Sequence, residues 1–259
     1  MLADPGALDG KTVLLTGASK GIGAATAQAL GRAGAHLIAH YGSDRAGAEV
    51  ATEDLPSNRV LLVGADLGRT EEVDRLWQRS LAWRGRIDVL VNNAAVMRLA
   101  GGIEAEDAEW DTVWDETLRV NVLAPVRLMR HAVRHYLAAS GGTLITVSSW
   151  AAQRGPGNPA LMAYGASKGA VLAATKAIAR NYAGRNVLAY IVAPGVVRTR
   201  LSEIASAATG GEAAVTATLA MGEWVPPSEV ADLIAWLATG TCRHLTGATL
   251  DVNGASYIR

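Results

Sequence analysis

Short, nearly continuous apolar runs alternate along the chain with longer segments in which apolar residues recur at helical spacing. Strands that are buried on both faces of a parallel sheet show such runs, and helical crossovers join them. The pattern predicts a strand that begins at Thr12 and further strands at 36–41, 60–64, 87–91, 143–147, 187–192 and 247–252. We therefore expect an α/β protein with a parallel sheet of about seven strands, flanked by helices on both faces.

The segments between the apolar runs predict helices. The first helix reaches residue 33, the third covers 71–84, and a long helical region extends over about 105–137. A further helix begins near Tyr164, and the last opens with Pro227, a residue that suits the first helical turn.

Length and continuity indicate a single domain. The 259 residues contain no internal repeat and no low-complexity linker, which fits one domain spanning 1–259. The segment 200–224 is rich in small residues and has Gly210 and Gly211 in its middle. This composition suits a mobile lid over a substrate pocket, which we expect at about 199–225.

Three glycines, Gly17, Gly21 and Gly23, follow the first strand and open the first helix. Glycine adopts backbone angles closed to other residues and has no Cβ, so a pyrophosphate can approach the main chain there. The N–H groups and the dipole of the helix favour its negative charge. A tight strand-to-helix crossover without a ligand is the alternative for the glycines taken alone.

Tyr164 and Lys168 lie four residues apart in a predicted helix, so both side chains project from one face. A free tyrosine has a pKa of about 10, and a neighbouring cation is needed if it is to move protons at neutral pH. Lowering that pKa by about 3 units requires roughly 4 kcal/mol, which a lysine in a shielded cleft can help to supply. A surface pair is the alternative for this spacing by itself.

The motif Thr16-Gly17-x-x-x-Gly21-Ile22-Gly23, followed by Tyr164-x-x-x-Lys168, resembles the short-chain dehydrogenase/reductase family in its non-extended branch. Members similar to 3-oxoacyl-carrier-protein reductase and carbonyl reductase share this pattern, and the resemblance covers almost the entire chain. It implies a single doubly wound (Rossmann-type) domain. It also implies an enzyme that transfers a hydride between a nicotinamide cofactor and a carbonyl or alcohol substrate.

The resemblance assigns a role to each of four catalytic positions. Tyr164 is then the general acid or base, and Lys168 also holds the nicotinamide ribose. Ser149 hydrogen-bonds the substrate oxygen, and Asn121 holds a water in the proton path. Ser149 lies 164 − 149 = 15 residues before the tyrosine, slightly more than the commonest family spacing, so we expect an enlarged loop at the pocket.

The resemblance places the cofactor-binding positions at the strand ends. Asn93 lies in a turn similar to the family's Asn-Asn-Ala-Gly, with Ala95 replacing the glycine, and serves both turn and cofactor. Asp66 either reaches the adenine, as in the family, or caps the helix that starts near Thr70. The full expected set is Gly17, Ser19, Lys20, Gly21, Ile22, Gly23, Tyr41, Ser43, Asp66, Leu67, Asn93, Tyr164, Lys168, Pro194, Gly195, Val197 and Thr199.

The end of the second strand favours NADP over NAD. A carboxylate there grips the ribose hydroxyls of NAD and repels the extra phosphate of NADP, but the expected position is Tyr41. Ser43 can accept a phosphate, while Lys20 and Arg45 can supply positive charge. Asp44 is the counterargument, because a carboxylate that bends back to the ribose would favour NAD. The alternatives for Asp44 are that it turns to solvent or caps the next helix.

Composition narrows the partners. Lys plus Arg and Asp plus Glu balance at 24 each, so no basic field attracts nucleic acid. Apolar stretches end before the roughly 20 residues that span a bilayer, and the N-terminus shows no signal peptide, so we expect a cytoplasmic protein with no membrane partner.

Cys242 is the single cysteine. His131 and His135 share a helix face without a carboxylate or cysteine cluster, so no metal is expected.

We therefore expect an NADPH-dependent ketone reductase, acting on a small-molecule carbonyl or alcohol. The alternatives are an NAD-dependent alcohol, polyol or sugar dehydrogenase, and a non-catalytic dinucleotide-sensing regulator. The family's enoyl reductases space their tyrosine and lysine more widely than Tyr164 and Lys168. By resemblance, and because the helices around Asn121 and Tyr164 are apolar, we expect a homotetramer with the last strand and residues 253–259 near a subunit contact.

Overall fold

The apolar runs form one parallel sheet in the computed structural model, which describes residues 3–259. The strands lie in the order β3-β2-β1-β4-β5-β6-β7. Their bounds are β1 (Thr12–Leu15), β2 (His36–Tyr41), β3 (Val60–Gly64), β4 (Val89–Asn92), β5 (Gly142–Val147), β6 (Val187–Pro194) and β7 (Thr249–Val252). The chain builds outward from β1 to β3 and then returns to β4 on the other side of β1. The switch point of this doubly wound sheet therefore lies between β1 and β4.

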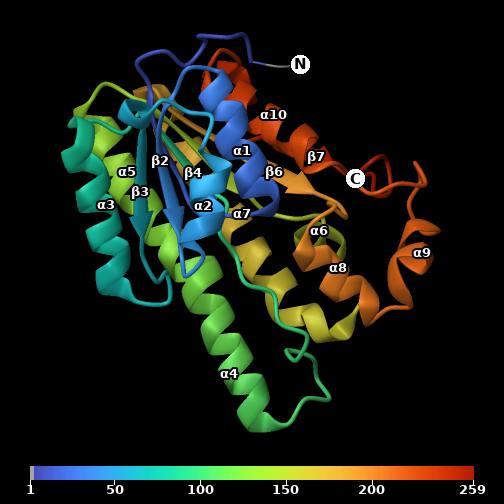
Figure 1. Cartoon of the computed structure of the whole chain (residues 1–259). Coiled ribbons are helices and arrows are strands. Elements are labelled where there is room, and N and C mark those ends of the chain that lie inside the picture. The colour runs from blue at the N-terminus through green and yellow to red at the C-terminus, as the bar shows by residue number, and fades with distance from the viewer. Residues whose placement is uncertain (1–2) are drawn as a thin grey trace.

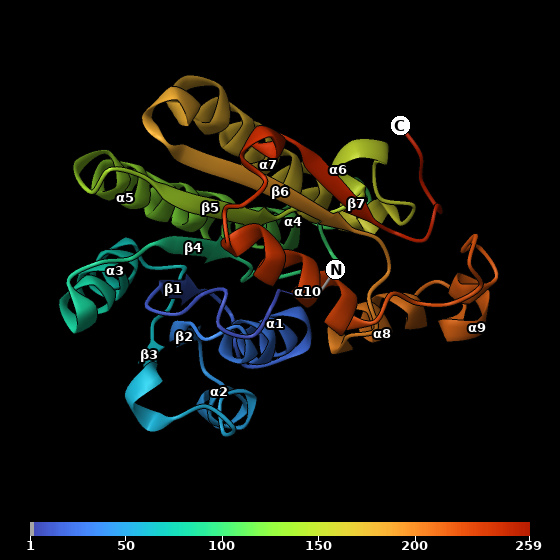
Figure 2. The same cartoon turned by 90° about the horizontal axis from the view of Figure 1, so that it is seen from above.

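Helices cover both faces of the sheet (Figures 1 and 2). On one face α1 packs against α10, while α5 and α7 lie on the opposite face. The helices are α1 (Gly21–Arg32), α2 (Arg45–Ala51), α3 (Thr70–Arg84), α4 (Asp107–Leu118), α5 (Ala124–Ala138), α6 (Ala151–Arg154), α7 (Met162–Tyr182), α8 (Arg200–Ala207), α9 (Gly211–Thr216) and α10 (Pro227–Ala238). This arrangement confirms the predicted fold class.

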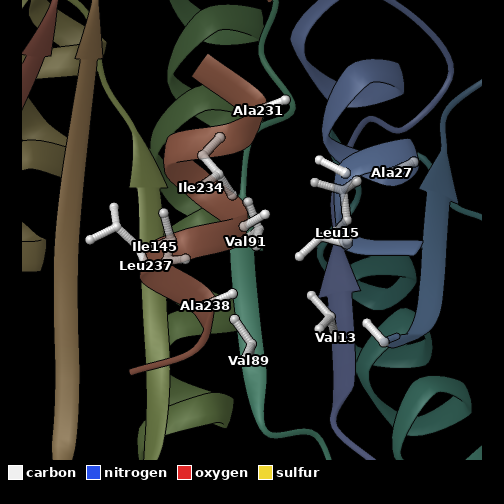
Figure 3. Close-up of a cluster of buried hydrophobic side chains, with 14 of the residues drawn as sticks. Val13, Leu15, Ala27, Val89, Val91, Ile145, Ala231, Ile234, Leu237 and Ala238 are labelled. Atoms are coloured by element: carbon white, nitrogen blue, oxygen red, sulfur yellow. The ribbon is translucent and has the colours of Figure 1, made fainter. Parts of the chain in front are cut away.

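Successive strand residues point to opposite faces, so each strand contributes to two cores. Val13 and Leu15 pack with α10, whose Ile234 and Leu237 lie over the neighbouring strands (Figure 3). Leu14, between them in sequence, belongs to the cluster on the other face. Burial on both faces explains why the strands appear in the sequence as continuous apolar runs.

The predicted elements differ from the observed ones mainly at their ends. The fourth strand begins at Val89 rather than at residue 87, the sixth extends to Pro194, and the seventh begins at Thr249. The long helical region predicted at about 105–137 is interrupted by a π-helical turn, Arg119–Leu123. The turn contains Asn121, whose role is described below.

The predicted lid segment folds as two short helices, α8 and α9, which lie beyond the edge of the sheet (Figure 1). Its two ends are fastened together, because the Arg198 N–H donates to the Val225 carbonyl at 2.9 Å and the Val225 N–H donates to the Val196 carbonyl at 2.8 Å. Gly210 and Gly211 join the two helices with φ of +93° and +87°. Left-handed backbone of this kind favours glycine.

Within residues 3–259, no helix is long and apolar enough to cross a membrane.

Candidate active site

The three motif glycines lie at the carboxyl end of β1, beside the switch point of the sheet. Gly17 and Gly21 have φ of +72° and +56°, and a Cβ on Gly23 would lie 1.8 Å from the Gly17 carbonyl oxygen. Only glycine fits that contact. Lys20 precedes α1 without a side-chain cap, and the first turn carries no acidic residue. The N-terminus of α1 therefore presents uncapped N–H groups and a positive dipole end, which fit the pyrophosphate of a dinucleotide.

Side-chain hydrogen bonds fasten this glycine loop to β4. Asn93 Nδ2 donates to the carbonyls of Thr16 and Gly17 at 2.9 and 3.0 Å. The hydroxyl of Thr16 accepts from the N–H groups of Asn93 and Ala94 at 3.0 and 3.1 Å. The asparagine thus performs the structural half of its expected role, while a direct contact of Asn93 with the cofactor stays a prediction.

His40 also holds the glycine loop, and the sequence analysis did not single it out. Its Nδ1 accepts from the Gly17 N–H at 3.1 Å, and its Nε2 lies 3.0 Å from the Ala65 carbonyl. These partners require a neutral ring with the proton on Nε2. Burial lowers the pKa of His40 accordingly. The available signal was a polar residue inside an apolar strand, because a buried polar group needs partners.

The end of β2 carries the residues on which cofactor choice was argued. Asp44 caps α2, because its Oδ1 accepts from the Gly47 N–H at 2.9 Å. Of the three fates considered for this carboxylate, capping is therefore the observed one. Arg45 pairs with Glu49 at 2.8 Å, so its charge is partly compensated. Ser43 and Lys20 are exposed.

Tyr41 and Ser19, two further predicted cofactor-binding residues, lie near the end of β2 and the start of α2. The ring of Tyr41 packs over Gly64, where a Cβ would lie 2.9 Å from the ring. The Ser19 hydroxyl donates to the Asp44 carbonyl at 2.6 Å and so ties the glycine loop to the start of α2.

Asp66 follows β3 and does not cap α3. Its Oδ1 accepts from the Gly68 N–H at 2.8 Å, which closes a tight turn. The N-cap position of α3 belongs to Arg69. The capping alternative was therefore wrong, because Asp66 lies three residues before the N-cap position of α3 (69 − 66 = 3) and its carboxylate binds the Gly68 N–H instead. Leu67 is buried in the core under α3.

The two catalytic candidates on α7 project from one helix face, as their spacing predicts. Lys168 is 4% exposed, and its Nζ lies 5.7 Å from the centre of the Tyr164 ring. The same Nζ donates to the Val147 carbonyl at 2.8 Å. Burial lowers the pKa of Lys168 to about 8.

Burial raises the pKa of Tyr164, and its interaction with the Ser149 hydroxyl opposes that rise. The sequence spacing predicts that the lysine lowers the tyrosine pKa, whereas in the protein alone the desolvation of the phenol dominates.

Of the two adjacent serines after β5, Ser149 belongs to the site. The Ser148 hydroxyl donates to the Lys168 carbonyl at 2.9 Å and is buried against α7. The Ser149 hydroxyl accepts from the Ala151 N–H at 3.1 Å and interacts with Tyr164. The expected loop enlargement between serine and tyrosine contains the short helix α6, which the sequence analysis did not predict.

Asn121 lies in the π-helical turn and is 2% exposed. Its Oδ1 accepts from the Val96 N–H, and its Nδ2 donates to the Val96 carbonyl, both at 2.8 Å. Nδ2 also contacts the Ser167 hydroxyl at 3.1 Å. Asn121 thus joins the loop after β4 to α7, three residues beyond Tyr164. The extra residue of a π turn is a common feature of functional sites in helices.

The turn after β6 closes the site on the side of β7. The Gly195 N–H donates to the Val252 carbonyl at 2.9 Å, and a Cβ on Gly195 would lie 2.8 Å from the Asn253 Cβ. Further along, the Thr199 Cγ2 lies 3.0 Å from where a Cβ of Gly21 would stand. Pro194 and Val197 are buried. The fold therefore brings Thr199, at the start of segment 199–225, against the glycine loop.

These residues converge at the carboxyl ends of the central strands, where open α/β sheets bind ligands. The glycine loop, the Tyr164–Lys168 pair and the turn at Gly195 come from β1, α7 and the end of β6. Ser43 and Asp66 follow β2 and β3 at the other end of the site, and Lys20 lies in the glycine loop after β1. A doubly wound fold with this site defines a dinucleotide-dependent oxidoreductase.

Comparisons with known proteins identify the family. The family described as enoyl-(acyl carrier protein) reductase matches residues 17–255. The chain is 33% identical to 3beta-hydroxysteroid dehydrogenase 1 of Eggerthella lenta, over 95% of this chain and 94% of that protein. The chain therefore belongs to the short-chain dehydrogenase/reductase family and is an NAD(P)-dependent enzyme.

Two solved structures show the same fold. The angucycline C-6 ketoreductase LanV with bound NADP has a TM-score of 0.84 and 33% identity, over 96% of each chain. The 3-ketoacyl-(acyl-carrier-protein) reductase from Brucella melitensis, complexed with NADH, has a TM-score of 0.85 and 28% identity, over 96% of this chain and 99% of that one. Similar proteins thus bind either nicotinamide dinucleotide.

Proposed function

We propose that the protein is an NADPH-dependent ketone reductase. The observation that carries this proposal is the placement of Tyr164 and Lys168 on one face of α7, with the Ser149 hydroxyl interacting with the tyrosine. A proton donor and an oxygen-orienting donor at one point are what carbonyl reduction requires. When bound, the cofactor supplies the hydride.

In the proposed mechanism, the Ser149 hydroxyl donates to the substrate oxygen and aligns it with the Tyr164 hydroxyl. Tyr164 gives its proton to that oxygen as negative charge develops there. Lys168 stabilises the resulting phenolate and binds a ribose hydroxyl through its remaining N–H groups. Asn121 fixes the loop after β4 and lies at the entry of the proton path. In the reverse direction, the tyrosine accepts the proton from an alcohol.

The preference for NADP over NAD rests on the charges near the end of β2. Oδ1 of the Asp44 carboxylate caps α2, which supports a role for Asp44 in the helix rather than at a ribose. Lys20 is exposed beside the glycine loop, and no ion pair involves it among residues 3–259. Lys20 and Ser43 are therefore proposed to hold the 2′-phosphate. Arg45 contributes less, because Glu49 already pairs with it.

Dissociation constants for NADPH and NADH, measured for wild type and Lys20→Ala, test this preference. We expect NADPH to bind more tightly and the variant to weaken NADPH binding selectively. Lys176→Ala, a change at an exposed lysine of α7, is the matched control. If NADH binds at least as tightly as NADPH, and Lys20→Ala weakens neither, the preference is refuted.

The reaction class is tested by the loss of NADPH absorbance with a panel of ketones, sugars and acyl thioesters. Reduction of ketones would support the proposal. Turnover of polyols or sugars with NAD alone would favour an NAD-dependent dehydrogenase, and cofactor binding without any turnover would favour a dinucleotide-sensing regulator. Enoyl reduction is disfavoured, although the matching family model carries that description, because Tyr164 and Lys168 are only four residues apart.

Assembly and location complete the proposal. We propose a homotetramer in which the exposed apolar residues Leu118, Leu123 and Val126 lie in subunit contacts. The protein is proposed to work in the cytoplasm.

The segment 199–225 is proposed to be the substrate lid.

A further inference from the structure

Trp150 directly follows Ser149, and its indole ring is the platform on which a second side chain stacks. The Trp150 N–H donates to the Pro194 carbonyl at 3.0 Å. A Cβ on Gly195 would lie 3.5 Å from the Trp150 ring, so the indole lies against the turn that closes the site. Trp150 is therefore anchored by two contacts to the end of β6.

An arginine is stacked on this platform. The guanidinium carbon of Arg154 lies 4.2 Å from the centre of the Trp150 ring. Trp150 and Arg154 are four residues apart on either end of α6, so the short helix itself brings them together. The guanidinium also lies near the loop after α6, where its Nη2 is 3.8 Å from the position of a Cβ on Gly157. The side chain is exposed to solvent.

Other arginines around the carboxyl edge of the sheet have carboxylate partners. Arg98 forms two hydrogen bonds with Glu116, at 2.8 and 2.6 Å, and Arg198 pairs with Glu212 at 2.8 Å. Arg259 pairs with Asp251 at 2.9 Å. In contrast, none of the ion pairs or hydrogen bonds found between residues 3 and 259 involves the Arg154 guanidinium. An arginine held over an aromatic ring keeps the N–H groups at the edge of its guanidinium plane free, and these groups can form a two-pronged bond with an anion.

We propose that Arg154 binds an anionic group of the substrate, so that the physiological substrate is a carbonyl compound that carries a carboxylate or a phosphate. This inference rests on the proposed reductase function. The carbonyl lies at Ser149 and Tyr164, and the anionic group lies one helical turn along α6, at the Trp150–Arg154 stack. The arginine fixes which end of the substrate enters first and takes no part in the proton transfer.

Matched substrate pairs test the proposal with wild type and Arg154→Gln. The pairs are acetoacetate and levulinate, each with its methyl ester, and dihydroxyacetone phosphate with dihydroxyacetone. We expect wild type to prefer the anionic member of a pair, and we expect Arg154→Gln to raise KM for that member by about 10- to 100-fold, the effect of losing a charged hydrogen-bond pair. The neutral member should change less than about twofold. Arg154→Lys keeps the charge but not the planar fork and should recover only part of the loss.

Arg84→Gln is the control, because Arg84 also stacks on a tryptophan, at 4.8 Å from the Trp83 ring, but at the end of α3. This variant should leave every substrate unchanged. The carboxylate pairs and the phosphate pair distinguish the two anions. Equal use of anionic and neutral members by wild type, or an equal loss on both in Arg154→Gln, would overturn the proposal.

Calorimetric titration with levulinate separates this proposal from the proposed function. If no carbonyl is reduced but wild type binds levulinate and Arg154→Gln does not, the reductase function fails while the anion site stands. If ketones are reduced and levulinate binding is unaffected by Arg154→Gln, the anion site fails alone.

Discussion

At the scale of single residues, the site depends on groups whose charge is opposed by burial. The pKa of Tyr164 is raised and that of Lys168 is lowered to about 8, both because the side chains are desolvated. A nearby opposite charge stabilises the charged form of each group. A phenolate would stabilise the charged lysine, and the lysine and a cationic nicotinamide would stabilise the phenolate. In the proposed mechanism, a bound cofactor would add the positive charge that stabilises the phenolate.

Replacing Tyr164 by Phe should lower kcat by at least about 10²-fold, the scale of general acid–base catalysis, because it removes only the hydroxyl. Cofactor affinity should stay close to that of wild type. Lys168→Met should damage both turnover and cofactor affinity, since the lysine serves two roles. Steady-state rates and fluorescence titration with NADPH measure both, and near wild-type turnover by Tyr164→Phe would contradict the mechanism.

We expect His40 to make the free energy of unfolding depend on pH. Its pKa is lowered by burial, so between about pH 6.5 and the lower native pKa the unfolded chain binds a proton that the folded chain does not. The free energy of unfolding should therefore fall as the pH falls through this range, by at most about 1.4 kcal/mol per pH unit from this residue. Above about pH 6.5 the contribution is fully retained.

Urea unfolding of wild type and His40→Asn across this pH range measures the effect. Asparagine keeps an acceptor for the Gly17 N–H but cannot be protonated, so the variant should lose less stability in acid than wild type does. His135 and His36 also have lowered pKa values and remain in both proteins, so some slope persists. Parallel curves for the two proteins would show that His40 is not responsible.

At the scale of elements, the π-helical turn between α4 and α5 connects three parts of the site. It orients Asn121 so that one amide holds both backbone groups of Val96 and contacts Ser167 on α7. The loop after β4 and the helix that carries Tyr164 are therefore coupled through a single buried side chain.

Asn121→Ala should lower the free energy of unfolding by roughly 2–3 kcal/mol, because it leaves the Val96 N–H without its partner in a buried site. Activity should fall as well, since the loop after β4 is released. Asn181→Ala is the control: its Nδ2 donates to the Ala177 carbonyl on the exposed side of α7, and its loss should cost less than about 0.5 kcal/mol. Equal unfolding midpoints for both variants in urea would refute this coupling.

At the scale of the whole molecule, exposed apolar side chains gather along the continuous helix from α4 to α5. Leu123 is 63% exposed, and Leu118 and Val126 are 38% and 37% exposed. Large apolar side chains on one exposed element commonly mark contacts between proteins. These residues lie on the helix that the family resemblance predicts to pack against other subunits.

Leu123→Lys should therefore disrupt the proposed tetramer, because a charge would be buried in the subunit contact. Light scattering at micromolar concentration measures the assembly state. Val50→Lys, at a 60% exposed position on α2, is the control and should assemble as wild type does. A wild-type protein that is a stable monomer would refute the tetramer itself.

The chain by itself determined the order of the strands, the longer helices and the principal motifs, but it did not predict the short helices α6, α8 and α9. Continuous apolar runs appear wherever a strand is buried on both faces, so the seven strands could be located to within about two residues at most ends. The glycine spacing and the Tyr164–Lys168 pair are local features, since one loop or one helical turn fixes their geometry. These short-range features were therefore sufficient for the fold class and for the placement of Tyr164 and Lys168 on one face of α7.

Only the tertiary structure decided how distant residues meet. His40 and Gly17 are 23 residues apart, and Asn121 and Val96 are 25 apart, so no local pattern reveals that they bond. The fate of the Asp44 and Asp66 carboxylates depended on which N–H group the folded backbone presents, and both bind glycine N–H groups nearby. The raised pKa of Tyr164 also depends on the tertiary structure, because all the residues that pack around the ring contribute to its desolvation. The sequence spacing predicts only that Lys168 lies on the same helix face.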